Sequence, residues 1–159
     1  MNRPHASAVL VVTAALLFGL SGCNRPANPG AEGHGVTPVK APHVPGQANV
    51  VGKGTRFAAA LFFTPAEPKV SQLFTVRTVV TTADGAAVKA DAVTVDATMP
   101  AHGHGMMTKP QHKPTADGAW QTDGMKLHMH GRWVFEVMVR VGAETETLKI
   151  PFDQPPEAL

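Results

Sequence analysis

Apolar and polar residues alternate with a period of two along much of the second half of the chain. The clearest example is residues 133–141, whose apolar positions are Trp133, Phe135, Val137, Val139 and Val141. Because successive side chains of a β-strand point to opposite faces of a sheet, this alternation predicts a strand with one buried face. No window shows a convincing apolar stripe with the 3.6-residue period of an amphipathic helix. The pattern therefore predicts a chain built of β-sheet.

Other short segments carry similar strand signals. They are residues 56–63, which could also form a buried helix, and residues 73–82, 93–99, 120–122, 125–130 and 145–152. Turn signals such as Asp84-Gly85 and Asp123-Gly124 separate several of them. About seven short strands over roughly 100 residues predict an all-β, immunoglobulin-like β-sandwich. The chain has one cysteine, so the disulfide common in that fold cannot form.

Residues 1–22 have the pattern of a lipoprotein signal peptide. A positively charged start precedes an apolar run over residues 6–20, which has the length of a signal-peptide core and is short for a bilayer span. The run ends at Leu20-Ser21-Gly22-Cys23, a pattern that lipoprotein signal peptidases recognise. We expect an exported protein whose Cys23 carries fatty acids such as palmitate, which anchor it to the lipid bilayer.

The segment 23–53 is expected to be the lipidated cysteine followed by a flexible tether, because it is rich in proline and glycine and has no apolar period. Its His34 and His43 are not expected to be specific ligands. The folded domain is then expected at residues 54–159. Asn24 follows the cysteine, where an aspartate would retain a lipoprotein in the inner membrane. In a Gram-negative cell we therefore expect the outer membrane, with the domain facing the periplasm.

Histidine and methionine are concentrated between residues 99 and 130. Five of the eight histidines and five of the seven methionines lie in this stretch. Imidazole and thioether together suit Cu(I), whereas imidazole alone suits Cu(II), zinc or nickel. Residues 99–107 contain no acid, which disfavours calcium and magnesium because these ions need oxygen ligands. The stretch therefore predicts a copper site.

The expected copper ligands are His102, His104, Met106, His128 and Met129. Gly103 and Gly105 allow a tight turn that would bring His102 and His104 to the same side. Met107 and His130 are second-choice candidates for copper ligands.

The other candidates are given structural or solvent roles. Met99 is expected to fill the core at the end of a strand, Trp133 to pack inward, and His112 to lie in a solvated loop. On the expected strand 125–130, His128 shares a face with Lys126 and His130, while Met129 lies on the other. The sequence leaves open which of these faces looks inward.

The order Met-Pro-x-His-Gly-His-Gly-Met from Met99, followed by His-Met-His-Gly-Arg-Trp from His128, resembles the YtkA-like family and the related FixH-type periplasmic domains. The resemblance covers about residues 71–152. It implies a small immunoglobulin-like sandwich, exported or attached to a membrane, that handles copper for respiratory oxidases or copper tolerance. His130 stands where the family usually has proline, which could add a ligand or be a surface change.

Two functions are compatible with these patterns. The first is a copper-binding protein for Cu(I), with Cu(II) as a second option, acting as scavenger, tolerance factor or metallochaperone. Its partner would be a copper-requiring oxidase or an efflux component. The second is a metal-free interaction or assembly module for such an envelope complex. The chain has no basic stripe for nucleic acid and no GxSxG or HExxH motif. We therefore expect a protein that is not an enzyme. We also expect it to be a monomer.

Overall fold

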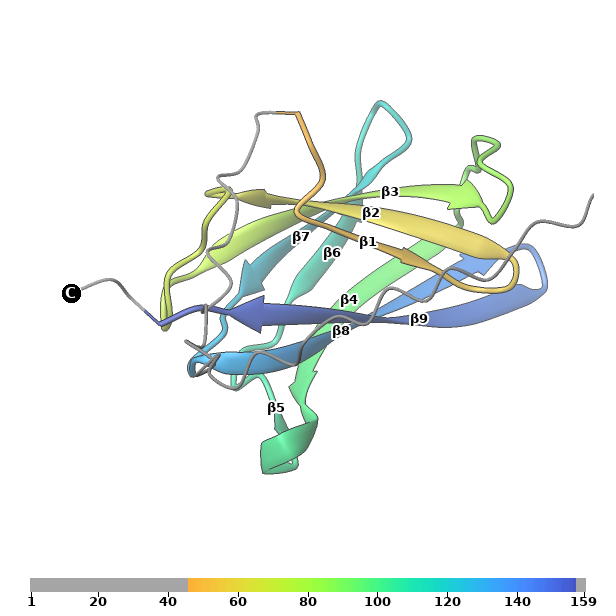
Figure 1. Ribbon diagram of the computed structural model, residues 1–159. Coiled ribbons are helices and arrows are strands. Elements are labelled where there is room, and N and C mark those ends of the chain that lie inside the picture. Colours follow the sequence, from red (N-terminus) through yellow and green to blue (C-terminus); the bar gives the residue numbers. More distant parts are fainter. Residues whose placement is uncertain (1–45, 157–159) are drawn as a thin grey trace, which may run out of the picture. The chain divides into compact units, whose positions relative to one another are not determined.

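Two antiparallel sheets form the part of the chain that the computed structural model describes, residues 46–156 (Figure 1). The expected signal segment, Cys23, His34 and His43 lie outside the described residues. The five-stranded sheet has the order β1 (Val50–Lys53), β2 (Phe57–Thr64), β3 (Phe74–Thr82), β7 (Trp120–Met125) and β6 (Gln111–Pro114). The four-stranded sheet has the order β5 (His104–Gly105), β4 (Ala92–Met99), β8 (Gly131–Val141) and β9 (Glu144–Gln154).

The strand order is that of an immunoglobulin-like sandwich, which is the fold class that the sequence predicts. Such folds place strands A-B-E-D in one sheet and C-F-G in the other, with C′ beside C when it is present. If β2 is taken as strand A, the two sheets here read A-B-E-D and C′-C-F-G. The short strand β1 is an addition that pairs with the outer edge of β2. Over residues 46–156 there is no helix with the length and apolar character needed to cross a membrane.

Period-two alternation builds the core. On β8, Trp133, Phe135, Val137 and Val139 are fully buried, while the residues between them are partly exposed. The ring of Phe63 on β2 lies 5.4 Å from that of Phe135, so aromatic contacts join the two sheets. Within residues 46–156, all buried apolar residues fall between Phe57 and Phe152. The domain therefore encloses its own core.

Several elements differ from the sequence prediction. Residues 56–63, for which the sequence leaves both strand and buried helix open, are largely strand. The strand β1 lies inside the segment 23–53 expected to be a tether, so the sheet begins before residue 54. The expected strand 125–130 is wrong, because β7 ends at Met125 and residues 126–130 belong to no strand. His112 is not in a loop either, since it lies on β6, half-buried, with its Nδ1 3.0 Å from the Thr122 hydroxyl.

The carboxylate of Glu146 on β9 stabilises the turn between β1 and β2 through hydrogen bonds. It accepts hydrogen bonds from the backbone N–H groups of Thr55, Arg56 and Phe57, and from the Thr55 hydroxyl. Gly54 makes room for it, because a Cβ there would lie 2.5 Å from a Glu146 oxygen. Hydrogen bonding, first from the Thr55 hydroxyl, lowers the pKa of Glu146 to about 2.

We expect Glu146→Gln to destabilise the domain at neutral pH by roughly 1 kcal/mol, since the turn loses a charged acceptor that is partly exposed. The folded pKa lies below the unfolded value, so this carboxylate contributes stability above about pH 4.5 and loses it as the pH falls toward 2. Urea unfolding at pH 7 and pH 3 measures both effects. The difference in free energy of unfolding between wild type and variant should shrink at pH 3. An unchanged difference would contradict the stabilising role of the Glu146 carboxylate.

Candidate metal centre

The chain reverses direction immediately after β4, and this reversal places the first two histidines. A one-turn 3₁₀ helix, η1 (Pro100–His102), ends at Gly103, whose φ of 68° is left-handed and suits glycine. The Gly103 N–H donates to the Met99 carbonyl oxygen at 3.1 Å. The chain then returns as β5, which pairs His104 with Met99. The segment of η1 and β5 therefore projects from the end of β4 (Figure 1). His102 in η1 is exposed, while His104 in β5 is half-buried.

Met106 connects this projection to the segment after β7. Its backbone N–H donates to the Ala97 carbonyl oxygen at 3.1 Å, which continues the return along β4. Its sulfur accepts the Lys126 N–H at 3.5 Å, and its side chain packs on the core. The hydrogen bond brings residues 126–130 next to the loop although the two segments are distant in the sequence.

The histidines of the two segments meet at this point. The rings of His104 and His128 have centroids 5.0 Å apart, and the rings of His102 and His104 have centroids 5.7 Å apart. The imidazoles of His102, His104 and His128 therefore lie in a row, from the exposed end of the loop to the half-buried His128. Ligands were predicted both from the loop after β4 and from residues 126–130, and the structure brings the histidines of these two segments together.

Both half-buried imidazoles have a nitrogen free for a ligand. The Nδ1 of His104 lies 3.3 Å from the Gly105 carbonyl oxygen, which can only accept, so the Nδ1–H tautomer leaves Nε2 with a lone pair. Metal-bound histidines commonly donate their other N–H to a carbonyl in this way. The Nδ1 of His128 is buried without a hydrogen-bond partner. Burial, then repulsion from His104 and Lys126, lowers the pKa of His128 and favours its neutral form.

The indole of Trp133 forms the buried side of this cluster. Its ring centroid lies 5.3 Å from that of His128 and 6.1 Å from that of His104, with both imidazoles steeply inclined to it. Its Nε1–H donates to the Met129 carbonyl oxygen at 3.0 Å, and its side chain is fully buried. Trp133 is thus a core residue, as the sequence predicts, but it also contacts the site, which the sequence reasoning missed.

The remaining candidates take other places. Met129 packs on the core, and its carbonyl rather than its sulfur has a defined partner. The Nδ1 of His130 lies 3.0 Å from the Pro155 carbonyl oxygen, toward the end of β9. Met107 is 81% exposed beside the loop, and Met99 is 2% exposed in the core, as expected. The structure therefore brings the rings of His102, His104 and His128 together, and it places the Met106 sulfur beside the segment that carries His128.

The donor set of this cluster has a definite chemical character. Within residues 46–156, no group of three or more His, Cys, Asp or Glu side chains is placed to hold a metal ion. The site offers the half-buried imidazoles of His104 and His128, with the Met106 thioether beside the segment that carries His128. These donors fit a soft ion such as Cu(I) better than an ion that needs oxygen ligands. The unpartnered nitrogen of His128 is the feature that a bound ion would satisfy.

A family model described as YtkA-like matches residues 55–138, which is just over half of the chain. The chain belongs to the YtkA-like family. The match covers both segments that contribute histidines to the cluster of this YtkA-like domain. Comparison with curated proteins gave no match, and comparison with solved structures gave none.

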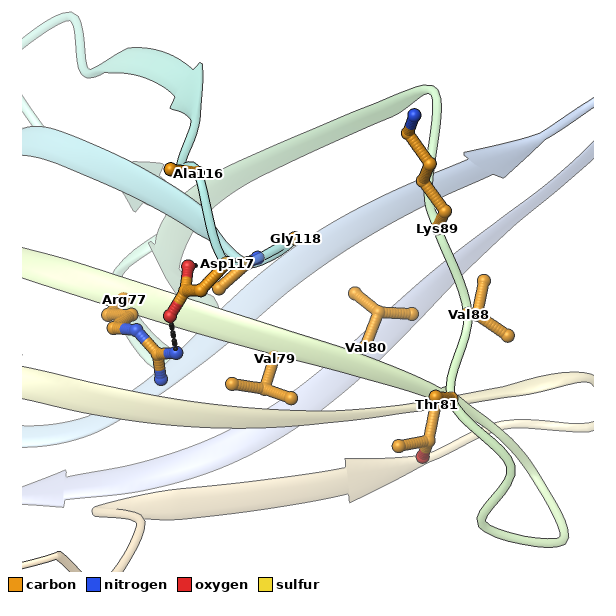
Figure 2. Close-up of a pocket in the computed structure, with 11 residues that line it drawn as sticks. Arg77, Val79, Val80, Thr81, Val88, Lys89, Ala116, Asp117 and Gly118 are labelled. Atoms are coloured by element: carbon orange, nitrogen blue, oxygen red, sulfur yellow. Dashed lines mark hydrogen bonds and ion pairs between the residues drawn. The ribbon is translucent and has the colours of Figure 1, made fainter.

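A pocket elsewhere on the YtkA-like domain lies beside β3 and the turn between β6 and β7 (Figure 2). Val79, Val80 and Val88 line it, with the Arg77–Asp117 ion pair near the turn and Lys89 at the other end. None of its lining residues is a histidine or a methionine. The pocket is therefore separate from the candidate metal centre.

Proposed function

We propose that this YtkA-like domain binds copper, as Cu(I) with Cu(II) in second place, and acts as a scavenger, tolerance factor or metallochaperone. The observation that carries the proposal is the approach of His104 and His128 to 5.0 Å between ring centroids, beside an unpartnered His128 nitrogen. We propose a binding role rather than an enzymatic one.

His104, His128 and Met106 would hold the ion, with His102 next to them on the exposed side. Neutral imidazole and thioether groups bind Cu(I) without a thiol, which an oxidising compartment would consume. The contact between Met106 and the Lys126 N–H is consistent with this set, since it fixes the sulfur beside the segment that carries His128.

The proposed location is the periplasm, with Cys23 lipidated and inserted in the bilayer. Asn24 favours the outer membrane over the inner one. A domain anchored there is better placed to capture copper than to deliver it directly to an oxidase in the inner membrane. The proposal therefore favours scavenging or tolerance, with an efflux component as the more accessible partner.

The test is an anaerobic titration of residues 24–159, which contain the whole compact unit, with Cu(I) in the presence of a competing chelator. Wild type should withdraw Cu(I) from the chelator, and the double variant His102→Ala, His104→Ala should do so much less. The matched control is His112→Ala, which removes a half-buried histidine that hydrogen-bonds to Thr122 instead. Wild-type binding no tighter than that of the double variant would rule out the site.

The exposed side chain of Met107 supports a second function, a metal-free interaction module. Methionine suits adaptable protein contacts, and a side chain 81% exposed is available for one. Pull-down from envelope extracts with wild type and with the double variant separates the two functions. Capture of the same partner by both, together with no Cu(I) binding, would favour the interaction module.

A further inference from the structure

The chain has two tryptophans, and one of them lies against the proposed copper ligands. Trp133 is buried on β8, with its indole N–H already bonded to the Met129 carbonyl oxygen. Its ring is therefore fixed in orientation and has no polar group left to satisfy. Its ring meets those of His104 and His128 at interplanar angles of 63° and 78°.

The three ring distances locate the space between the imidazoles relative to the indole. With centroids 5.0, 5.3 and 6.1 Å apart, the midpoint between the His104 and His128 rings lies about 5 Å from the indole centre. A cation is attracted to an aromatic ring within about 6 Å of its centroid, most strongly by tryptophan. An ion held between the two imidazoles would be within this range.

We propose that the indole of Trp133 is a wall of the metal site and contributes directly to binding Cu(I) in preference to Zn(II). This inference rests on the proposed function. The indole occupies the buried side of the ligand pair, and its only polar group is already bonded to the Met129 carbonyl oxygen. The ion then has few ligands, two imidazoles and the Met106 thioether, together with an aromatic surface.

Selectivity follows from the number and type of donors. Zinc sites in proteins are nearly always tetrahedral, with four nitrogen, sulfur or oxygen ligands. Within residues 46–156, no three His, Cys, Asp or Glu side chains are arranged so that they could hold a metal ion together. Cu(I) is satisfied by two or three soft donors, and a desolvated aromatic wall favours a singly charged ion over one that must keep bound water. The same wall therefore favours Cu(I) and disfavours Zn(II).

The two tryptophans allow a matched fluorescence test on residues 24–159. Trp120→Phe leaves Trp133 as the sole emitter, whereas Trp133→Phe leaves Trp120, which lies at the start of β7 opposite Thr78 and Pro114. Anaerobic Cu(I) should quench and red-shift the emission of Trp120→Phe in proportion to the bound fraction. The emission of Trp133→Phe should change little. Zn(II) should have little effect on either protein.

Affinity provides the second measurement. Trp133→Phe should weaken Cu(I) binding roughly two- to thirtyfold in the chelator competition, because phenylalanine attracts a cation less and fills less of the wall. Its affinity for Zn(II) should not fall. If Trp133→Phe folds poorly, the fluorescence titration of Trp120→Phe still tests the inference, because Trp133 is intact in that protein.

The outcomes separate the inference from the proposed function. Tight Cu(I) binding that leaves the emission of Trp133 unchanged would overturn the inference alone. Equal affinity for Zn(II) and Cu(I) would overturn the stated selectivity. If wild type fails to compete with the chelator for Cu(I), the proposed function fails and the inference fails with it.

Discussion

Replacing His128 by alanine should weaken Cu(I) binding by about 100-fold or more, the largest single effect that we expect on the site. Loss of a group that merely orients a metal ligand typically costs 10–100-fold in affinity, and a ligand itself should cost at least as much. His128 is the imidazole nearer to Trp133, its Nδ1 is buried without a partner, and burial lowers its pKa, which favours the neutral form. Anaerobic competition with a chelator measures the change.

His130→Ala is the matched control for this prediction. It removes a histidine from the same segment, but one whose Nδ1 faces the Pro155 carbonyl oxygen rather than the cluster. Its Cu(I) affinity should stay within about threefold of wild type, which corresponds to less than about 0.7 kcal/mol. If the two variants bind Cu(I) equally well, His128 is not a ligand and the metal site must be placed elsewhere.

The parts of the fold that follow a simple period were predictable from the sequence. Along β8 the apolar positions from Trp133 to Val139 are all buried, because strand geometry alone decides which face each residue takes. The strands β3 and β4 follow the same rule. The segment 56–63 was ambiguous because a short apolar run satisfies both strand and helix. Its pairing with β1 and β3 along its length makes it a strand.

The segment after β7 shows where periodicity fails. Residues 125–130 alternate in character, yet their backbone groups bond to three separate parts of the molecule. The Lys126 N–H meets the Met106 sulfur, the Leu127 carbonyl oxygen accepts from Ser71, and the Met129 carbonyl oxygen accepts from Trp133. These partners are distant or belong to side chains, so no local pattern could reveal them. The same partners place His128 beside the loop.

The candidate site was predictable in part. The glycine-spaced pair His102 and His104 and the later His128 were expected together, because each lies in a stretch of metal-ligating residue types, and the structure brings them together. Trp133 was assigned to the core from its strand position alone. A tryptophan can be buried and still contact a site at the end of its strand. Trp133 lies two residues after Gly131, where β8 begins. A Cβ at Gly131 would lie 2.9 Å from the Met99 side chain.

Phe135→Ala should destabilise the domain by about 3–5 kcal/mol, the largest effect that we expect on the fold. Phe135 is fully buried on β8, and its ring contacts those of Phe63 and Phe152 at centroid distances of 5.4 and 5.6 Å. Alanine would leave a cavity between the sheets and remove both aromatic contacts. Urea unfolding of residues 24–159, followed by circular dichroism, measures the loss.

Val134→Ala is the matched control, since Val134 neighbours Phe135 but faces outward and is only half-buried. We expect it to cost less than about 1 kcal/mol, because little apolar surface is lost and no cavity forms. The contrast between adjacent positions tests the alternation on which the fold assignment depends. Similar losses at both positions would mean that β8 does not present alternate residues to the core. In that case the placement of Trp133 beneath the histidines would fail as well, because it depends on the same strand register.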